Sequence, residues 1–157
     1  MRLLPILLVL SAGTADAQIL QRVLPGRAPP APVLMGIDAL RADFIARTGS
    51  DKVYFAGDSV GLTPQARATL AAQAMWLRQH PELVVRVEGH ADVSDTRDHA
   101  LAVGARRAEE VRNYLILLGA PAAQLTALSW GKERVAVMGS SPEALALNRR
   151  VVTVLVR

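Results

Sequence analysis

Three charged residues have types and positions that suit a binding site for a small molecule carrying both a positive and a negative group. Asp58 and Asp92 each follow a short β-rich run, where a strand is expected to give way to a loop. Arg107 lies in a stretch with helical spacing, on the flank of the apolar stripe. A carboxylate accepts hydrogen bonds from an ammonium group, and a guanidinium holds a carboxylate with two bonds. We therefore expect Asp92 and Arg107 to face each other across a shallow cleft, with Asp58 at the same edge.

The same residues also have a purely structural explanation. Arg107 and Asp92 could form an ion pair that fixes the loop, and breaking a partly buried pair costs about 3–5 kcal/mol. Asp58 could be a turn residue, which is the commonest use of aspartate in loops. The residues by themselves favour this structural explanation, so a binding role needs a further argument.

Strands and helices alternate along the part of the chain that carries these residues. The predicted order is β-α-β-α-β-α-β, which gives an α/β sandwich with a four-stranded mixed sheet and helices on one face. The last predicted strand is apolar on both faces, which is typical of a central strand. Strands are expected at 51–56, 83–88, 124–130 and 151–156, and helices at 64–80, 96–118 and 142–147.

The longest predicted helix contains a glycine in its interior. Gly104 costs about 1 kcal/mol relative to alanine at such a position, and a close approach of the helix to the sheet would explain it. The residues expected on the buried face of this helix are Leu101, Gly104, Ala108, Val111, Leu115 and Leu118.

The chain divides into four segments. The first resembles a secretory signal peptide, with Arg2, an apolar run and an A-x-A site ending at Ala17, so the exported chain would begin at Gln18. A proline-rich tail follows, in which Pro25 to Pro32 favours an extended spacer. The predicted boundaries are a cleavable signal peptide at 1–17, a Pro-rich tail or linker at 18–36, a short lead-in helix at 37–50 and the main domain at 51–157.

Composition limits the function further. The chain contains no cysteine, so export would not serve disulfide formation. Gly13 stands where the lipid-bearing cysteine of a lipobox would be, so we expect no lipid anchor and, with the predicted signal peptide, a location in the periplasm. The net charge is +4, but the basic residues are spread out and aromatic residues are few, which argues against nucleic acid as a partner.

Five separate blocks, in order and spacing, resemble the OmpA-like C-terminal domain family, and within it most closely the peptidoglycan-associated lipoproteins. The resemblance covers about residues 51–157. The blocks are Val87–Asp92, Gly104–Ala108, Tyr114–Leu115, Ser129–Glu133 and Asn148–Arg150.

The resemblance implies a mixed β/α sandwich that binds the peptidoglycan stem peptide non-covalently at meso-diaminopimelate. It also implies contact with the cell wall or outer membrane from the periplasm. Asp58 falls where the family has an aspartate that helps line the ligand pocket. Asp92 falls on the aspartate that holds the amino-acid end of the ligand, and Arg107 on the arginine that pairs with its carboxylate. With this resemblance, binding becomes the favoured explanation of the three residues.

The chain departs from the family pattern at three places. Gly57 replaces the phenylalanine that usually precedes the first aspartate, so an apolar wall is missing. The pair His99-Ala100 replaces a Tyr-Asn pair, and Asp95 replaces a glycine. If these changes collapse the pocket, the alternative is a diverged domain that has lost wall binding and serves as a protein-interaction module, with the Tol system or other envelope proteins as partners.

Other classes of function have little support in the sequence. The chain has no cysteine nucleophile and no G-x-S-x-G motif, and an arginine beside Asp92 would keep that carboxylate ionised. We therefore predict no enzyme activity and no cofactor. His90 and His99 flank Asp92, but their spacing matches no compact ligand pattern, so we also predict no metal site.

Overall fold

The computed structural model describes residues 36–156. The predicted signal peptide and all but the last residue of the predicted tail lie outside these residues. The helices are α1 (Ile37–Thr48), α2 (Pro64–Gln79), α3 (Arg97–Leu117) and α4 (Pro142–Asn148), with a short 3-10 helix, η2 (Ala122–Gln124). The strands are β1 (Lys52–Tyr54), β2 (Val85–His90), β3 (Leu125–Gly131) and β4 (Arg150–Leu155). The predicted order of strands and helices is confirmed.

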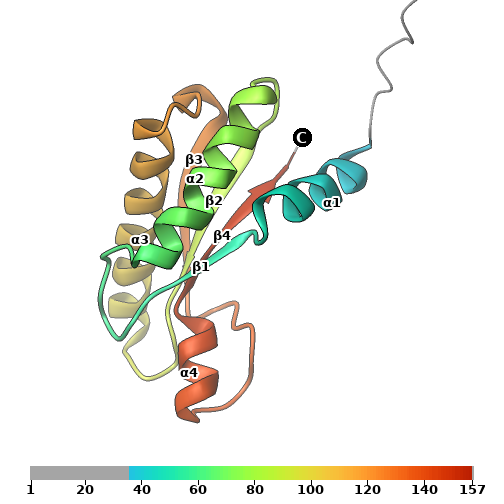
Figure 1. Ribbon diagram of the computed structural model, residues 1–157. Coiled ribbons are helices and arrows are strands. Elements are labelled where there is room, and N and C mark those ends of the chain that lie inside the picture. The colour runs from blue at the N-terminus through green and yellow to red at the C-terminus, as the bar shows by residue number, and fades with distance from the viewer. Residues whose placement is uncertain (1–35, 157) are drawn as a thin grey trace, which may run out of the picture. The chain divides into compact units, whose positions relative to one another are not determined.

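The four strands form one mixed sheet in the order β1-β4-β2-β3. Strands β2 and β3 run parallel, and β4 pairs antiparallel with both β1 and β2. The last strand of the chain is therefore internal, as its apolar sequence predicts (Figure 1). Because β2 and β3 are parallel, α3 must cross over between them, and it lies along the face of both.

Local sequence explains where the helices begin and end. The Thr63 hydroxyl accepts a hydrogen bond from the Ala66 amide at 3.1 Å, and Pro64 fills the first turn of α2. Thr96 caps α3 in the same way through the His99 amide, at 3.3 Å. Gly119, just after α3, has a φ of 94°, a conformation that glycine adopts without strain.

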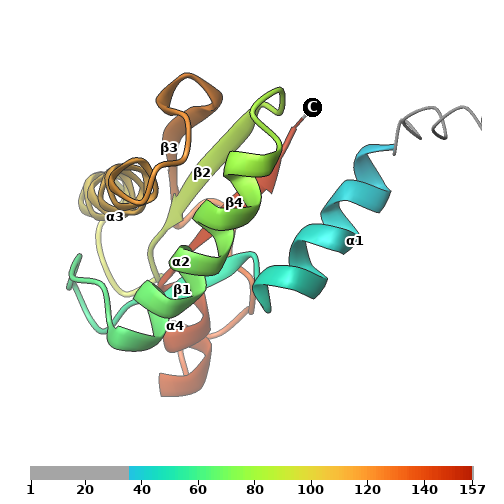
Figure 2. The same ribbon diagram turned by 45° about the horizontal axis from the view of Figure 1, so that its top comes forward.

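Helices α2 and α3 cover one face of the sheet, and the core lies between these layers (Figures 1 and 2). Helix α1 packs on α2, where the Phe44 and Trp76 rings meet edge to face at 5.1 Å. The most deeply buried aliphatic residues are Leu70, Leu77, Val85, Val87, Val111, Leu115, Val151 and Leu155.

The buried face of α3 differs from the predicted one in detail. Leu101 and Leu118 are only half-buried, whereas Ala100 and Val103 are buried. Arg107 was expected on the flank of the stripe, yet it is 1% exposed and lies fully inside. The buried face of α3 is therefore not purely apolar, and the Arg107 guanidinium on it donates to three backbone carbonyls.

Two glycines let α3 approach the sheet closely. A Cβ atom on Gly89 of β2 would lie 1.9 Å from the Gly104 carbonyl oxygen of α3. A Cβ atom on Gly104 would lie 2.3 Å from the Ser129 hydroxyl oxygen of β3. The predicted reason for a glycine inside the helix is confirmed, and this contact places α3 directly over the ends of β2 and β3.

Candidate functional site

The predicted site residues gather where β1 and β2 give way to loops. Asp92 follows β2 after a single residue, and Asp58 lies in the loop after β1, where Gly57 has a φ of 47°. Helix α3 carries Arg107 over the same edge. The structure therefore brings the three residues to one end of the sheet, although their mutual contacts differ from those expected.

Arg107 is bound by backbone carbonyl groups. Its Nε donates to the Ser59 carbonyl at 2.9 Å, one terminal nitrogen donates to the His90 carbonyl at 3.2 Å, and the other donates to the Gly57 carbonyl. The guanidinium carbon lies 5.1 Å from the centre of the Phe55 ring, within cation–π range. One side chain thus ties the loop after β1 to the end of β2.

Burial lowers the pKa of Arg107, and the positive charge of Arg149 lowers it further. The nearby carboxylates of Asp58, Asp92 and Asp95 act in the opposite direction. Because a guanidinium is a very strong base, Arg107 remains charged at neutral pH. The end of the sheet therefore holds a buried positive charge that attracts anionic groups.

Asp92 has a different arginine partner from the one expected. Its carboxylate accepts a hydrogen bond from Arg149 at 3.0 Å and others from the amide and hydroxyl groups of Ser94. Burial raises the pKa of Asp92, but the hydrogen bonds from Ser94 and the charge of Arg149 outweigh it and lower the pKa overall. Within residues 36–156, no ion pair joins Asp92 to Arg107, so the simple ion-pair explanation of these two residues is wrong.

Arg149 is the site residue that sequence reasoning missed. It donates to the Phe55 carbonyl at 3.2 Å as well as to Asp92, so it connects β1 to the loop after β2. The neighbouring Asn148 pins the chain in another way: its side-chain oxygen accepts from the Ala136 and Val137 amides, and its side-chain nitrogen donates to the Val137 carbonyl. Nothing in the linear sequence links position 149 to position 92.

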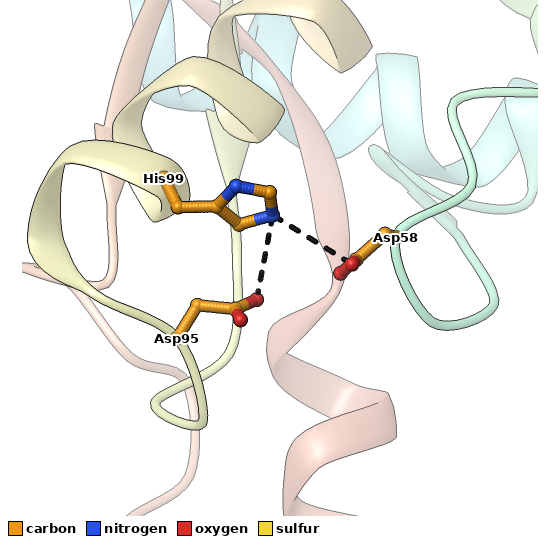
Figure 3. A group of neighbouring side chains, drawn as sticks. All are labelled: Asp58, Asp95 and His99. Carbon is orange, nitrogen blue, oxygen red and sulfur yellow. Dashed lines mark ion pairs between the residues drawn. The ribbon is translucent and has the colours of Figure 1, made fainter.

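Asp58 is the most accessible of the three predicted residues, with a side chain 69% exposed. Its carboxylate lies 3.6 Å from Nε2 of His99, which also lies 3.8 Å from the carboxylate of Asp95 (Figure 3). Two of the three departures from the family pattern, Asp95 and His99, thus meet Asp58 at the mouth of the site.

A largely apolar groove of about 500 Å³ adjoins this charged region. It runs along the edge strand β1 and is walled by α2 and α4, with Val53, Ala66 and Leu147 among its lining residues. Phe55 and Arg149 belong both to this groove and to the surroundings of Asp92 and Arg107.

Among the described helices, none is both long and apolar enough to cross a membrane.

The fold and the site together define an α/β binding domain: a four-stranded mixed sheet with a buried arginine and two acids at one end. The pattern of the OmpA family matches residues 54–149. The chain belongs to the OmpA family, whose members are cell-envelope proteins rather than enzymes.

Known relatives support this assignment. The chain is 41% identical over 113 residues to the peptidoglycan-associated lipoprotein of Rhizobium meliloti (strain 1021), covering 72% of this chain and 64% of that protein. It is 39% identical over 115 residues to the protein of the same name from Pseudomonas aeruginosa, covering 73% and 68%. The match thus spans about two thirds of the length of these relatives.

Solved structures agree with the fold. The crystal structure of the peptidoglycan-associated lipoprotein from Burkholderia pseudomallei matches with a TM-score of 0.66 and 37% identity, covering 68% of this chain and 91% of that chain. The C-terminal domain of Helicobacter pylori MotB matches with a TM-score of 0.63 at 22% identity, covering 68% and 84%. The second likeness concerns the fold alone.

Proposed function

We propose that this chain binds peptidoglycan non-covalently in the periplasm, at the meso-diaminopimelate of the stem peptide, and so contributes to envelope integrity. The observation that carries the proposal is the gathering of Arg107, Asp92 and Asp58 at one end of the sheet in a member of the OmpA family. The relatives named above are called peptidoglycan-associated, which supports the same ligand for this chain.

The chemistry of the ligand suits these groups. Diaminopimelate ends in an amino acid, so it carries an ammonium and a carboxylate on one carbon. The two aspartates would accept hydrogen bonds from the ammonium, and Arg107 would hold the carboxylate. Arg107 uses three N–H groups on carbonyls, and a guanidinium has about five in total, so further donors remain.

The loop after β1 would have to move when the ligand binds. The carbonyl groups of Gly57 and Ser59 cover Arg107, which is why its side chain is almost inaccessible. A ligand carboxylate could replace these two carbonyls and gain charge-assisted bonds worth about 1.5–3 kcal/mol each. After subtraction of the ordering cost, the single-site affinity should be on the order of micromolar to millimolar, which suffices on a wall that presents stem peptides densely.

Co-sedimentation with diaminopimelate-type sacculi, in buffer containing EDTA, tests the proposal. The protein would be the chain from Gln18 onward, which predicted signal cleavage would leave. Asp58→Asn is the most informative variant, because the exposed Asp58 side chain makes no hydrogen bond to the described fold. We expect the parent to sediment and Asp58→Asn to bind at least about tenfold more weakly, since it loses one charge-assisted contact.

Asp92→Asn and Arg107→Lys extend the test, with folding checked by circular dichroism because both residues hold the fold. Asp98→Asn is a matched control, since Asp98 is exposed in the first turn of α3 but lies outside the site. If the folded parent stays in solution, wall binding is wrong, and the protein-interaction alternative should be pursued instead.

A further inference from the structure

Two aspartates and a histidine converge at the mouth of the site. Asp58 comes from the loop after β1, Asp95 directly precedes the capping residue of α3, and His99 lies in the first turn of α3. One ligating atom from each lies within 4.8 Å of the other two. Figure 3 shows the His99 ring reaching toward both carboxylates with Nε2.

The spacing of these atoms suits a small metal ion. Zinc bonds to imidazole nitrogen and carboxylate oxygen are about 2.0–2.2 Å long, so tetrahedral ligand atoms lie about 3.3–3.6 Å apart. The separations from Nε2 in the structure are 3.6 Å to the Asp58 carboxylate and 3.8 Å to the Asp95 carboxylate. These two separations lie within a few tenths of an ångström of the tetrahedral spacing, and the two carboxylate oxygens lie within 4.8 Å of each other, so rotation of the exposed side chains would complete the geometry.

The two negative charges of the cluster also favour binding of a cation. Within residues 36–156, neither the Asp58 nor the Asp95 carboxylate forms an ion pair with an arginine or a lysine, and His99 is the ion-pair partner of both. Two positive charges lie further away: Arg107, whose pKa both carboxylates raise, and Lys132, which donates to the backbone carbonyl of Asp95. Two carboxylates gathered at one imidazole repel each other unless a positive charge lies between them. The Thr96 cap fixes the backbone of the turn that carries His99, and Asp95 directly precedes it, so the backbone positions of these two residues are set without a metal.

We propose that Asp58, Asp95 and His99 form a binding site for a divalent transition-metal ion of the zinc type. One imidazole nitrogen favours zinc, copper or nickel over magnesium or calcium, which prefer oxygen ligands alone. The three side chains are 69%, 35% and 47% exposed, so an ion can enter and a water molecule or a ligand group can take the fourth position. The sequence predicted no metal site, because the spacing of His90 and His99 around Asp92 gave no sign that the distant Asp58 would join them.

Isothermal titration with Zn²⁺ at pH 7, using the metal-free chain from Gln18 onward, tests the site. We expect saturable binding of one ion with a dissociation constant on the order of micromolar, and no comparable binding of Mg²⁺. Each of His99→Ala, Asp58→Asn and Asp95→Asn should weaken zinc binding at least about tenfold. The imidazole NMR signals of His99 should shift during the titration while those of the buried His90 stay in place.

Two control variants separate this site from incidental binding. Asp98→Asn removes a neighbouring carboxylate of α3, and His80→Gln removes a histidine that bonds the Trp76 carbonyl far from the cluster; both should bind zinc like the parent. Absence of saturable binding, or equal binding by parent and cluster variants, would overturn the proposal. The titration contains no wall material, so its failure would leave the proposed wall binding unaffected, and failure of sedimentation would leave the metal site unaffected.

Discussion

At the scale of single residues, a buried arginine, Arg107, and a half-buried one, Arg149, have different roles at the end of the sheet. Arg107 binds three backbone carbonyls and leaves Asp92 to Arg149. A carbonyl supplies only part of a negative charge, so Arg107 keeps much of its attraction for an anionic ligand. Arg149 instead neutralises Asp92 directly and holds it in position.

Loss of Arg149 should destabilise the domain. The side chains of Arg149 and Asp92 are only 19% and 8% exposed, so Arg149→Gln would leave a buried carboxylate without its partner. We expect a loss of about 3 kcal/mol in the free energy of unfolding, measured by urea denaturation at pH 7. Arg97→Gln is the matched control, because the pair of Arg97 with Glu133 is exposed and should contribute no more than about 1 kcal/mol. Equal losses for the two variants would contradict this assignment.

At the scale of elements, the site depends on how closely α3 lies on β2 and β3. Gly89 and Gly104 allow the helix backbone to touch the strand, and this contact places Arg107 of α3 within hydrogen-bond distance of the His90 carbonyl at the end of β2. At the N-terminal end of α3, the Thr96 cap holds the turn that carries His99.

Alanine substitutions at the two glycines should have unequal costs. A methyl group on Gly89 would meet the backbone of Gly104, which cannot move without displacing α3, so Gly89→Ala should cost about 3 kcal/mol or more. The nearest obstacle for Gly104→Ala is the Ser129 hydroxyl, which can rotate away, although the Gly89 carbonyl is also close. Thermal unfolding of both variants and of Gly104→Ala with Ser129→Ala measures the difference. If the Gly104→Ala variant is less stable than the Gly89→Ala variant, Gly89 is not the more tightly packed of the two positions.

At the scale of the whole molecule, the buried polar groups at one end of the sheet make folding sensitive to pH. His90 is 2% exposed, and its Nδ1 is buried without a hydrogen-bond partner among the described residues. Burial, together with the positive charge of Arg150, lowers the pKa of His90 from 6.5 to about 4. The folded protein therefore keeps this ring neutral where the unfolded chain would protonate it.

Acidification should weaken the fold between pH 7 and pH 5. Because the unfolded chain binds more protons than the folded protein in this range, the free energy of unfolding falls as the pH falls. We expect His90 to account for a loss of about 2 kcal/mol at pH 5. Urea denaturation at both pH values measures it, and His90→Gln should remove most of this loss whereas His80→Gln should retain it. The lowered pKa of Asp92 affects stability only below about pH 4, so Asp92 does not contribute to the difference between pH 7 and pH 5. If His90→Gln loses as much stability on acidification as the parent, His90 is not the cause.

The sequence by itself determined the order of strands and helices, their caps and the internal position of β4. These features follow from local rules: apolar periodicity, Thr63 and Pro64 at a helix start, and glycines at helix ends. The residue types at Asp58, Asp92 and Arg107, with five matching blocks, also predicted the family and the end of the sheet where these residues gather.

Only the tertiary structure decided which charged groups are partners. Asp92 contacts Arg149, and Asp58 meets Asp95 and His99, across separations in sequence that no local pattern encodes. The physical reason is that a buried charge takes whichever partner the packed backbone places within hydrogen-bond distance. That distance depends on the sheet order and on the close contact of α3 with β2, which exist only once the chain has folded.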